Sequence, residues 1–158
     1  MAYSRGNSKV KVEISLRTRA LRLLARREHS RVELERKLAP HATDPAELSE
    51  LLADLERHDW MSERRVVEQV TASRRRRFGS QRIAHELREK GIGLDAIAAA
   101  VSGLRESELD AARQVWRTKF SSLPASASER ARQVRFLQYR GFSFEIIKRV
   151  LKGGADDE

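Results

Sequence analysis

Histidine and acidic side chains are the residues of this chain that could hold a metal ion or move a proton. The histidines stand apart from one another in the sequence, at His29, His41, His58 and His85. His85 and Glu86 match the start of the zinc-binding pattern H-E-x-x-H, but Glu89 occupies the position of the second histidine. A zinc site on that helix needs a second imidazole one turn away. The sequence therefore predicts neither a metal site nor a metal cofactor.

The glycine-containing segments do not match the loops that bind nucleotides. The chain has no GxxxxGK[ST] loop, and Gly91-Ile92-Gly93 follows a predicted helix and not the strand that a dinucleotide site requires. Asp and Glu are frequent, but most lie at predicted helix starts or beside basic residues, where structural roles account for them. General acid–base catalysis needs two groups that converge in a cleft, and no such pair is indicated. We therefore expect a protein that is not an enzyme and binds no cofactor.

Four consecutive arginines, Arg74, Arg75, Arg76 and Arg77, indicate anion binding. Guanidinium groups bind carboxylates and phosphates through paired hydrogen bonds. One or two arginines would be explained by the negative end of a helix, which contributes roughly 0.3 to 1 kcal/mol per exposed charge. Because four exceed that need, the run favours an anionic partner over helix stabilisation or solvation alone. We expect these residues to lie on the last turn of a helix, so that they point in several directions.

The net charge of +9 is unevenly distributed along the chain. Residues 15–61 carry 9 basic and 9 acidic side chains, which cancel. Residues 62–93 carry 9 basic and 4 acidic side chains, and residues 108–151 again carry 9 and 4, so each of these segments contributes +5. A positive field of this kind indicates a polyanionic partner or an acidic protein surface, and it also favours solubility.

The elements that must position these cations come from three copies of one apolar pattern. The pattern Leu87, Gly91 and Ile97 recurs 50 residues later, and its leucine and isoleucine positions recur 49 residues earlier. The corresponding residues are Leu137, Gly141 and Ile147 in the later copy and Leu38 and Leu48 in the earlier copy. A unit of about 45 residues buries too little surface to fold alone, so each copy should pack on its neighbour.

The repeats define the predicted domain organisation and fold class. We expect a flexible basic arm over residues 1–14, three-helix repeats over 15–61, 62–106 and 107–151, and a disordered acidic tail over 152–158. No stretch shows the alternation of a strand. The predicted fold class is all-α, an elongated curved array of three tandem three-helix repeats.

Helix-start signals predict nine helices, three in each repeat. The cap residues are Ser or Asp, in most cases with an acidic residue in the turn that follows. They are Ser15, Ser30, Asp44, Ser62, Ser107, Ser126 and Ser143.

Glycine and aromatic residues predict how the helices join. Gly91 and Gly141 fall just past a helix end, where a left-handed backbone favours glycine. Ala42 takes this place in the first repeat, between two prolines, which predicts a turn of different shape. Trp60 and Met61 are expected to pack between the first and second repeats.

Composition predicts the cellular compartment of the protein. The chain has no cysteine, so it forms no disulfide and gives no hint of secretion. No apolar run approaches the roughly 18 to 20 residues that a membrane-spanning helix needs, and the segment MAYSRGNSKVKVE lacks the apolar core of a signal peptide. We expect a soluble, cytoplasmic monomer.

Three segments of the sequence resemble the RecX family of regulatory proteins. They are ALRLLARREHSRVELERKL in the first repeat, RFGSQRIAHELREKGI in the second and VRFLQYRGFSFEIIKRVL in the third. The segments RFLxxRGF and ELxxKGI are the more specific of these, and together the matches extend over residues 15–151.

The resemblance implies a function that the residue patterns alone do not identify. Proteins of this family bind the RecA recombinase and its filament on DNA, and they inhibit filament extension, strand exchange and the coupled ATP hydrolysis without being enzymes. This implies a role in DNA repair, homologous recombination and the SOS response. The contacts would be made by cations of the second and third repeats, namely Arg74, Arg75, Arg76, Arg77, Arg82, Arg88, Lys90, Arg135, Arg140, Lys148 and Arg149. Of these, Arg82, Arg88 and Lys90 are expected to remain available to solvent, and Lys148 and Arg149 to point outward.

A second hypothesis follows from the same cations. The chain could be a sequence-tolerant helical protein that binds the phosphate backbone of DNA or RNA. The spacing of helices around Gly91 and Gly141 fits this alternative, although the neighbouring helices lack a cluster of Asn, Gln and Arg that would read base edges. Salt dependence separates the two hypotheses, because phosphate contacts weaken steeply as salt rises.

Overall fold

Polar cap residues start most of the helices in the computed structural model, which describes residues 13–153. Six predicted caps are confirmed, because the side chain of each accepts a hydrogen bond from a backbone N–H in the first turn. They are Ser15, Ser30, Asp44, Ser62, Ser126 and Ser143. Nearly all of the predicted arm and tail, residues 1–12 and 154–158, lies outside the described residues.

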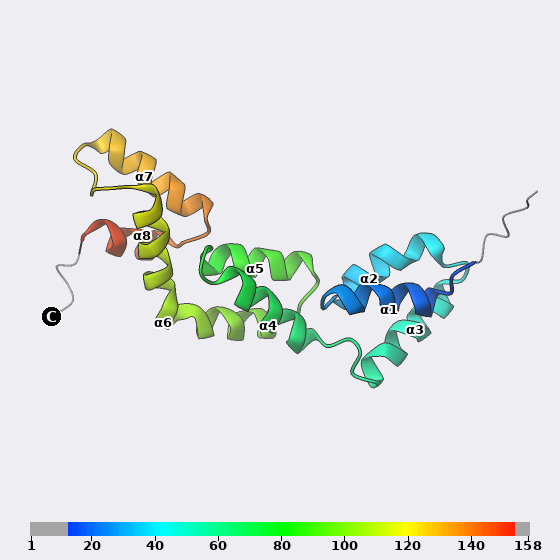
Figure 1. Ribbon diagram of the computed structural model, residues 1–158. Coiled ribbons are helices and arrows are strands. Elements are labelled where there is room, and N and C mark those ends of the chain that lie inside the picture. Colours follow the sequence, from blue (N-terminus) through cyan, green and yellow to red (C-terminus); the bar gives the residue numbers. More distant parts are fainter. Residues whose placement is uncertain (1–12, 154–158) are drawn as a thin grey trace, which may run out of the picture.

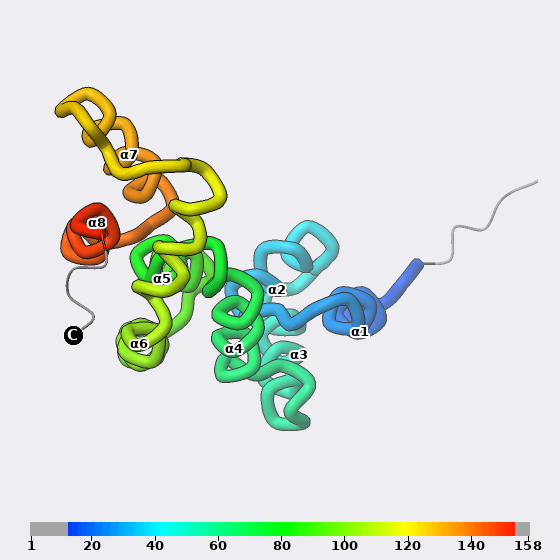
Figure 2. The backbone as a smooth tube through the Cα atoms, turned by 60° about the vertical axis from the view of Figure 1, so that its left-hand side comes forward, coloured from blue at the N-terminus to red at the C-terminus, as the bar shows by residue number. Residues whose placement is uncertain are grey.

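The described residues contain eight α-helices, one short 3-10 helix and no strand. The first repeat comprises α1 (Leu16–Arg26), α2 (Arg31–Leu38), the 3-10 helix η1 (Ala39–His41) and α3 (Pro45–Arg57). The second contains α4 (Glu63–Arg74), α5 (Ser80–Glu89) and the first half of α6 (Leu94–Lys119). The third contains the rest of α6, α7 (Ala127–Tyr139) and α8 (Phe144–Leu151). The first and third repeats lie at opposite ends of an elongated array (Figure 1 and Figure 2).

The prediction of nine helices is wrong, because α6 is shared by the second and third repeats. Ser107 does not cap a new helix: its hydroxyl donates to the Leu104 carbonyl at 3.3 Å, inside a helix that continues. No proline interrupts this region, and leucine, arginine and glutamate around Ser107 favour a continuing helix. The first half of α6 packs with α4 and α5 and the second with α7 and α8 (Figure 1).

The turns after α5 and α7 have the predicted backbone. Gly91 and Gly141 adopt φ angles of 74° and 87°, which L side chains rarely adopt. The first repeat turns differently, as predicted: Pro40 lies in η1, and Ala42 has an extended backbone with φ −87°.

Each repeat has its own buried apolar cluster. Leu34, Leu52 and Leu55 are central in the first, Ile83 and Leu87 in the second, and Leu137, Phe142 and Ile147 in the third. Met61 belongs to the cluster of the first repeat. Trp60 is 49% exposed, so the prediction that it packs between repeats is wrong. The adjacent Asp59 has φ 57°, and its left-handed backbone turns the chain between α3 and α4.

Candidate partner-binding surface

Phe78 gathers three of the predicted arginines at the join between the second and third repeats. The guanidinium carbon of Arg82 lies 4.2 Å from the centre of the Phe78 ring, that of Arg140 5.5 Å and that of Arg74 5.9 Å. A cation over an aromatic face is attracted by the ring quadrupole. These side chains come from the ends of α4 and α7 and from the start of α5, so one ring collects cations from two repeats.

Backbone contacts hold this join together. The Gly79 N–H donates to the Arg140 carbonyl at 2.8 Å, and the Gln81 N–H donates to the Gly141 carbonyl at 3.2 Å. A Cβ atom at Gly79 would lie 2.2 Å from the Gly141 carbonyl oxygen, and one at Gly141 would lie 2.3 Å from the Arg82 Cβ. Only glycine allows the two backbones to approach this closely.

A buried carboxylate completes the join. Gly79 caps α5 and has no side chain to offer the free N–H groups of the first turn. Glu108 of α6 supplies the acceptor, because both the N–H and the hydroxyl of Ser80 donate to its Oε1 at 2.9 Å. The negative charge also lies at the positive end of α5. The sequence does not reveal this pair, since the two residues are 28 positions apart.

Three of the four consecutive arginines do not lie on a helix. α4 ends at Arg74, and Arg75, Arg76 and Arg77 form the turn that leads to Phe78. The prediction that the run forms the last turn of a helix is therefore wrong. Arg75 to Arg77 are exposed, whereas Arg74 is partly buried and pairs with Glu86, with its Nε 3.1 Å from Oε2.

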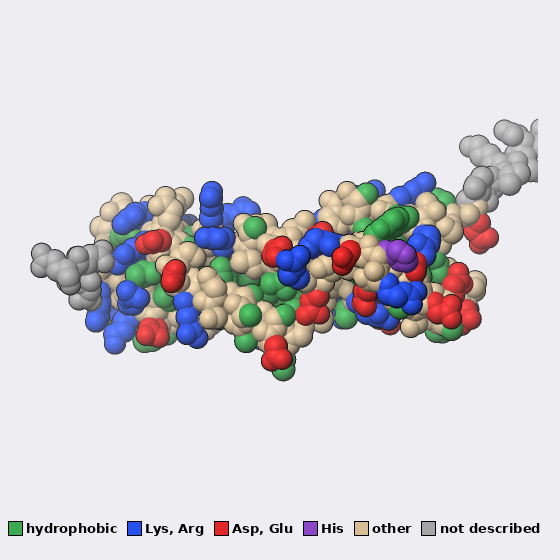
Figure 3. All heavy atoms as spheres, turned by 90° about the horizontal axis from the view of Figure 1, so that it is seen from below, with side chains coloured by type: hydrophobic (Ala, Val, Ile, Leu, Met, Phe, Trp, Pro, Cys, Tyr) green, Lys and Arg blue, Asp and Glu red, His purple; other side chains and the backbone are tan. Residues whose placement is uncertain are grey.

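The remaining predicted contact residues are distributed over both repeats. Arg88 on α5, Arg135 on α7 and Lys148 and Arg149 on α8 are exposed. Lys and Arg predominate over Asp and Glu at the end of the array that carries the third repeat, whereas acidic side chains gather at the opposite end (Figure 3). This distribution agrees with the charge counts of the repeats.

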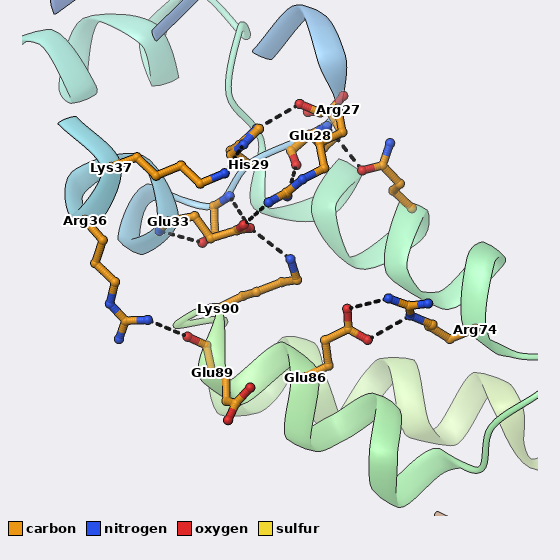
Figure 4. A network of polar contacts seen from close by, with 12 residues as sticks. Arg27, Glu28, His29, Glu33, Arg36, Lys37, Arg74, Glu86, Glu89 and Lys90 are labelled. Atoms are coloured by element: carbon orange, nitrogen blue, oxygen red, sulfur yellow. Dashed lines mark hydrogen bonds and ion pairs between the residues drawn. The ribbon is translucent and has the colours of Figure 1, made fainter. Parts of the chain in front are cut away.

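The prediction that Lys90 remains available to solvent is wrong. Its side chain is only 16% exposed, and its Nζ lies 3.1 Å from Oε1 of Glu33 in the first repeat. Glu33 also accepts hydrogen bonds from Arg27 at 2.5 Å and from the Ser30 N–H at 3.2 Å (Figure 4). Burial alone would raise the pKa of Glu33, but these three donors outweigh it and lower the pKa to about 2.

Other polar contacts join the first and second repeats. Arg65 Nε donates to Glu28 Oε1 at 2.9 Å, and Arg36 donates to the Glu89 carbonyl at 3.4 Å (Figure 4). His29 is buried beside this network. Its Nδ1 donates to the Arg27 carbonyl at 3.0 Å, and its Nε2 lies 3.1 Å from the Lys37 ammonium. Burial, together with the charges of Arg27 and Lys37, lowers the pKa of His29 and so favours the neutral ring.

Two aromatic residues of the third repeat are exposed, although the helical pattern of the sequence predicts that Phe144 faces inward. Tyr139 is 81% exposed at the end of α7, with the Arg82 guanidinium 5.9 Å from its ring centre. Phe144 is exposed at the start of α8. Their positions in the apolar pattern of a helix suggest burial, and only the packing of the repeats reveals that they face outward.

Within residues 13–153 no helix has the length and hydrophobicity needed to cross a bilayer, and no group of three or more His, Cys, Asp or Glu is arranged to hold a metal ion.

Three family models match the chain in order. They describe the first, second and third three-helix domains of RecX, and they match residues 17–55, 62–101 and 106–151. The third match begins inside α6, where one repeat passes into the next.

Relatives and solved structures agree with these matches. The chain is 50% identical over 140 residues to "Regulatory protein RecX" of Leptothrix cholodnii, covering 89% of each chain. It is 47% identical over 144 residues to the protein of the same name from Chromobacterium violaceum, covering 91% of this chain and 93% of the relative. The crystal structure of RecX from Lactobacillus salivarius has the same fold, with a TM-score of 0.73 and 19% sequence identity. The match covers 87% of this chain and 92% of that structure. The resemblance predicted from the sequence is confirmed: the chain belongs to the RecX family.

Proposed function

We propose that the protein is a non-enzymatic cytoplasmic regulator that binds RecA and the RecA–DNA filament as a monomer. It inhibits filament extension, strand exchange and the coupled ATP hydrolysis, and it acts in homologous recombination, DNA repair and the SOS response. Membership of a family whose relatives are named regulatory proteins supports the class of function. The elongated form supports binding along a filament, because an array exposes more surface per residue than a globule (Figure 1).

The observation that carries the proposal is the cluster of cations at the join of the second and third repeats. Arg75, Arg76 and Arg77 are exposed, and no carboxylate pairs with them in residues 13–153. An acidic surface of a partner would therefore gain hydrogen bonds from guanidinium groups without first breaking internal ion pairs. The predicted contact residues outside this cluster, Arg88, Arg135, Lys148 and Arg149, extend the same positive field over α5, α7 and α8.

Lys90 and Arg74 contribute differently in this proposal. Both belong to ion pairs inside the molecule, Lys90 with Glu33 and Arg74 with Glu86. Their role is to position the repeats and the cluster, and direct contact with the partner falls to the exposed cations.

Filament binding is tested by sedimentation of RecA filaments with the protein at about 200 mM salt, a concentration that weakens phosphate contacts by decades. We expect co-sedimentation and a lower rate of ATP hydrolysis. Reversal of charge in the double variant Arg75→Glu/Arg76→Glu should abolish both effects, while helicity and melting temperature stay nearly unchanged because neither side chain has an internal partner. Unchanged ATP turnover at several-fold excess of protein would contradict the proposal, and a large loss of stability in the variant would assign these arginines to the fold.

A specific observation also favours direct binding of single-stranded nucleic acid. Tyr139 presents an exposed ring beside Arg82, an arrangement on which a base can stack. If this is the main function, affinity should fall with a slope of about −0.7 per phosphate contact on a logarithmic salt scale. Tyr139→Ala should then weaken binding to oligothymidylate and leave binding to a recombinase filament unchanged.

A further inference from the structure

A groove lies beside the cation cluster, between the turn after α4, the second half of α6 and the end of α7. It has a volume of about 430 Å³. The charged and apolar residues that line it include Arg76, Arg77, Val115, Lys119, Phe136 and Arg140. Because the second half of α6 and α7 belong to the third repeat and the arginine turn to the second, the groove exists only where the two repeats meet.

The rim of the groove is positive. The Lys119 Nζ lies 5.9 Å and the Arg140 guanidinium carbon 5.4 Å from the centre of the Phe136 ring. Arg140 also donates to the Arg77 carbonyl at 3.3 Å, which fixes its position beside the turn. None of the four cations pairs with a carboxylate in the part of the chain that the structure describes. A concave apolar surface surrounded by charges of one sign concentrates the field inside it.

The floor of the groove is apolar, formed by Val115 and Phe136. The Phe136 ring is already engaged: two cations lie over it, and Phe120 meets it edge-on, with 5.3 Å between centres and 89° between planes. A base that stacks needs an open aromatic face. The neighbours of the Phe136 ring leave no such face open. The floor suits an aliphatic side chain better than a base.

We propose that this groove binds an acidic peptide segment of a protein partner, with an aliphatic side chain against Val115 and Phe136 and flanking carboxylates on Arg76, Arg77, Lys119 and Arg140. The inference rests on the proposed function, because it names the kind of segment that a protein partner presents at this surface. Carboxylates gain charge-assisted hydrogen bonds from the guanidinium groups, and the aliphatic anchor removes apolar surface from water.

The test uses the full chain and labelled probes in a fluorescence anisotropy titration. The first probe is a short peptide of alternating Asp and Glu with one central Leu. The second replaces every Asp and Glu by Asn and Gln, the third replaces the Leu by Ser, and the fourth is oligothymidylate of similar length. We expect the first peptide to bind about tenfold or more tightly than the second and third, and more tightly than oligothymidylate.

Two variants place the binding in the groove. Arg76→Glu/Lys119→Glu should weaken binding of the acidic peptide by about tenfold or more, since it reverses two charges of the rim. The matched control Arg22→Glu/Arg26→Glu makes the same change of net charge at exposed positions of α1, outside the predicted contact residues. It should alter affinity by less than about twofold, because screening limits distant charges. Thr118→Trp keeps the charge and fills the groove, where Thr118 is exposed; it should weaken binding of the Leu peptide and make the Leu and Ser peptides equivalent.

Several results would overturn the inference. They are the absence of peptide binding, stronger binding of oligothymidylate, or equal losses in the groove variant and the α1 control. Filament sedimentation with the unaltered protein is measured in parallel and tests the proposed function separately. Filament binding without peptide binding would contradict the groove proposal and leave the proposed function intact. Peptide binding without filament binding would contradict the proposed function and leave the groove as a peptide site.

Discussion

The two joins between the three repeats are built from different interactions. Side chains hold the first: Lys90 pairs with Glu33, Arg65 pairs with Glu28, and Gly91 faces the side chain of Val32. Backbone holds the second, through hydrogen bonds to the Arg140 and Gly141 carbonyls and through the continuous helix α6. Each repeat has its own apolar cluster, so these contacts decide how firmly neighbours are attached. Ion pairs between repeats hold the first join, so it should respond to salt and pH more strongly than the second, where backbone hydrogen bonds and a continuous helix make the main contacts.

The largest effect should come from a Cβ atom at the second join. Gly141→Ala forces an L residue to φ 87°, and its Cβ would lie 2.3 Å from the Arg82 Cβ and 2.7 Å from the Arg82 backbone nitrogen. The backbone strain and the contact together should cost roughly 3 kcal/mol or more, measured by urea unfolding.

Gly91→Ala is the matched control for that variant. It has a comparable φ of 74°, but its Cβ would meet the Val32 side chain, which can move, and not a backbone. We expect a loss of roughly 1 to 3 kcal/mol from the backbone conformation. If Gly91→Ala proved as destabilising as Gly141→Ala, the distinction between a side-chain join and a backbone join would fail.

A smaller effect is expected from charge reversal at the first join. Lys90→Glu removes a hydrogen bond to a charged group and places a second carboxylate beside Glu33, which should cost about 2 kcal/mol in the free energy of unfolding. Arg88→Glu makes the same charge change at an exposed position of α5 and should stay within about 0.5 kcal/mol. Equal losses in both variants would show that overall charge, and not the Lys90–Glu33 pair, matters there.

Acid should open the first join before the second. The pKa of Glu33 is lowered from 4.5 to about 2, so its stabilising contribution is complete above about pH 4.5 and is lost as the pH falls toward 2. The pKa of the buried His29 is also lowered, so folding favours the neutral ring, and this contribution declines once the pH falls below the ordinary value of 6.5. Glu33 pairs with Lys90 across the first join, and His29, Arg27 and Lys37 lie beside it in the first repeat.

Energy transfer between dyes measures the opening of each join directly. Because the chain contains no cysteine, Ser49→Cys, Ala98→Cys and Ser128→Cys introduce unique labelling sites at exposed positions of α3, α6 and α7. During acid titration the distance from α3 to α6 should increase before the distance from α6 to α7 changes. Simultaneous changes in both distances would contradict the comparison.

Local chemistry explains what could be predicted from the sequence. Helix caps depend on a side chain and a backbone N–H a few residues apart, so Ser30 with Glu33 and Asp44 with Pro45 are readable without a structure. The repeat spacing of 50 residues placed Gly91 and Gly141 at equivalent turns, because each turn depends on the conformation of one residue just past a helix end. The concentration of arginines at residues 74–77 was recognisable from the sequence alone, and its role in anion binding stays a prediction.

Contacts between distant residues explain what could not be predicted. Lys90 and Glu33 are 57 positions apart, and no local pattern indicates that this lysine turns inward. Phe78 collects Arg82 and Arg140 only because two repeats meet there. Ser107 has the sequence of a cap, but helix formers on both sides and packing against two repeats keep α6 continuous.

The continuity of α6 sets the rotational phase of the third repeat relative to the second. Each residue of a helix adds about 100° of rotation and 1.5 Å of rise. One residue inserted into the middle of α6 would therefore swing α7 and α8 around the helix axis and part the arginines that Phe78 gathers. The same insertion between α3 and α4, where the chain is not helical, would be absorbed by the loop. Evolution can thus vary the angle of the first repeat residue by residue, but it can change that of the third only in steps of whole helical turns.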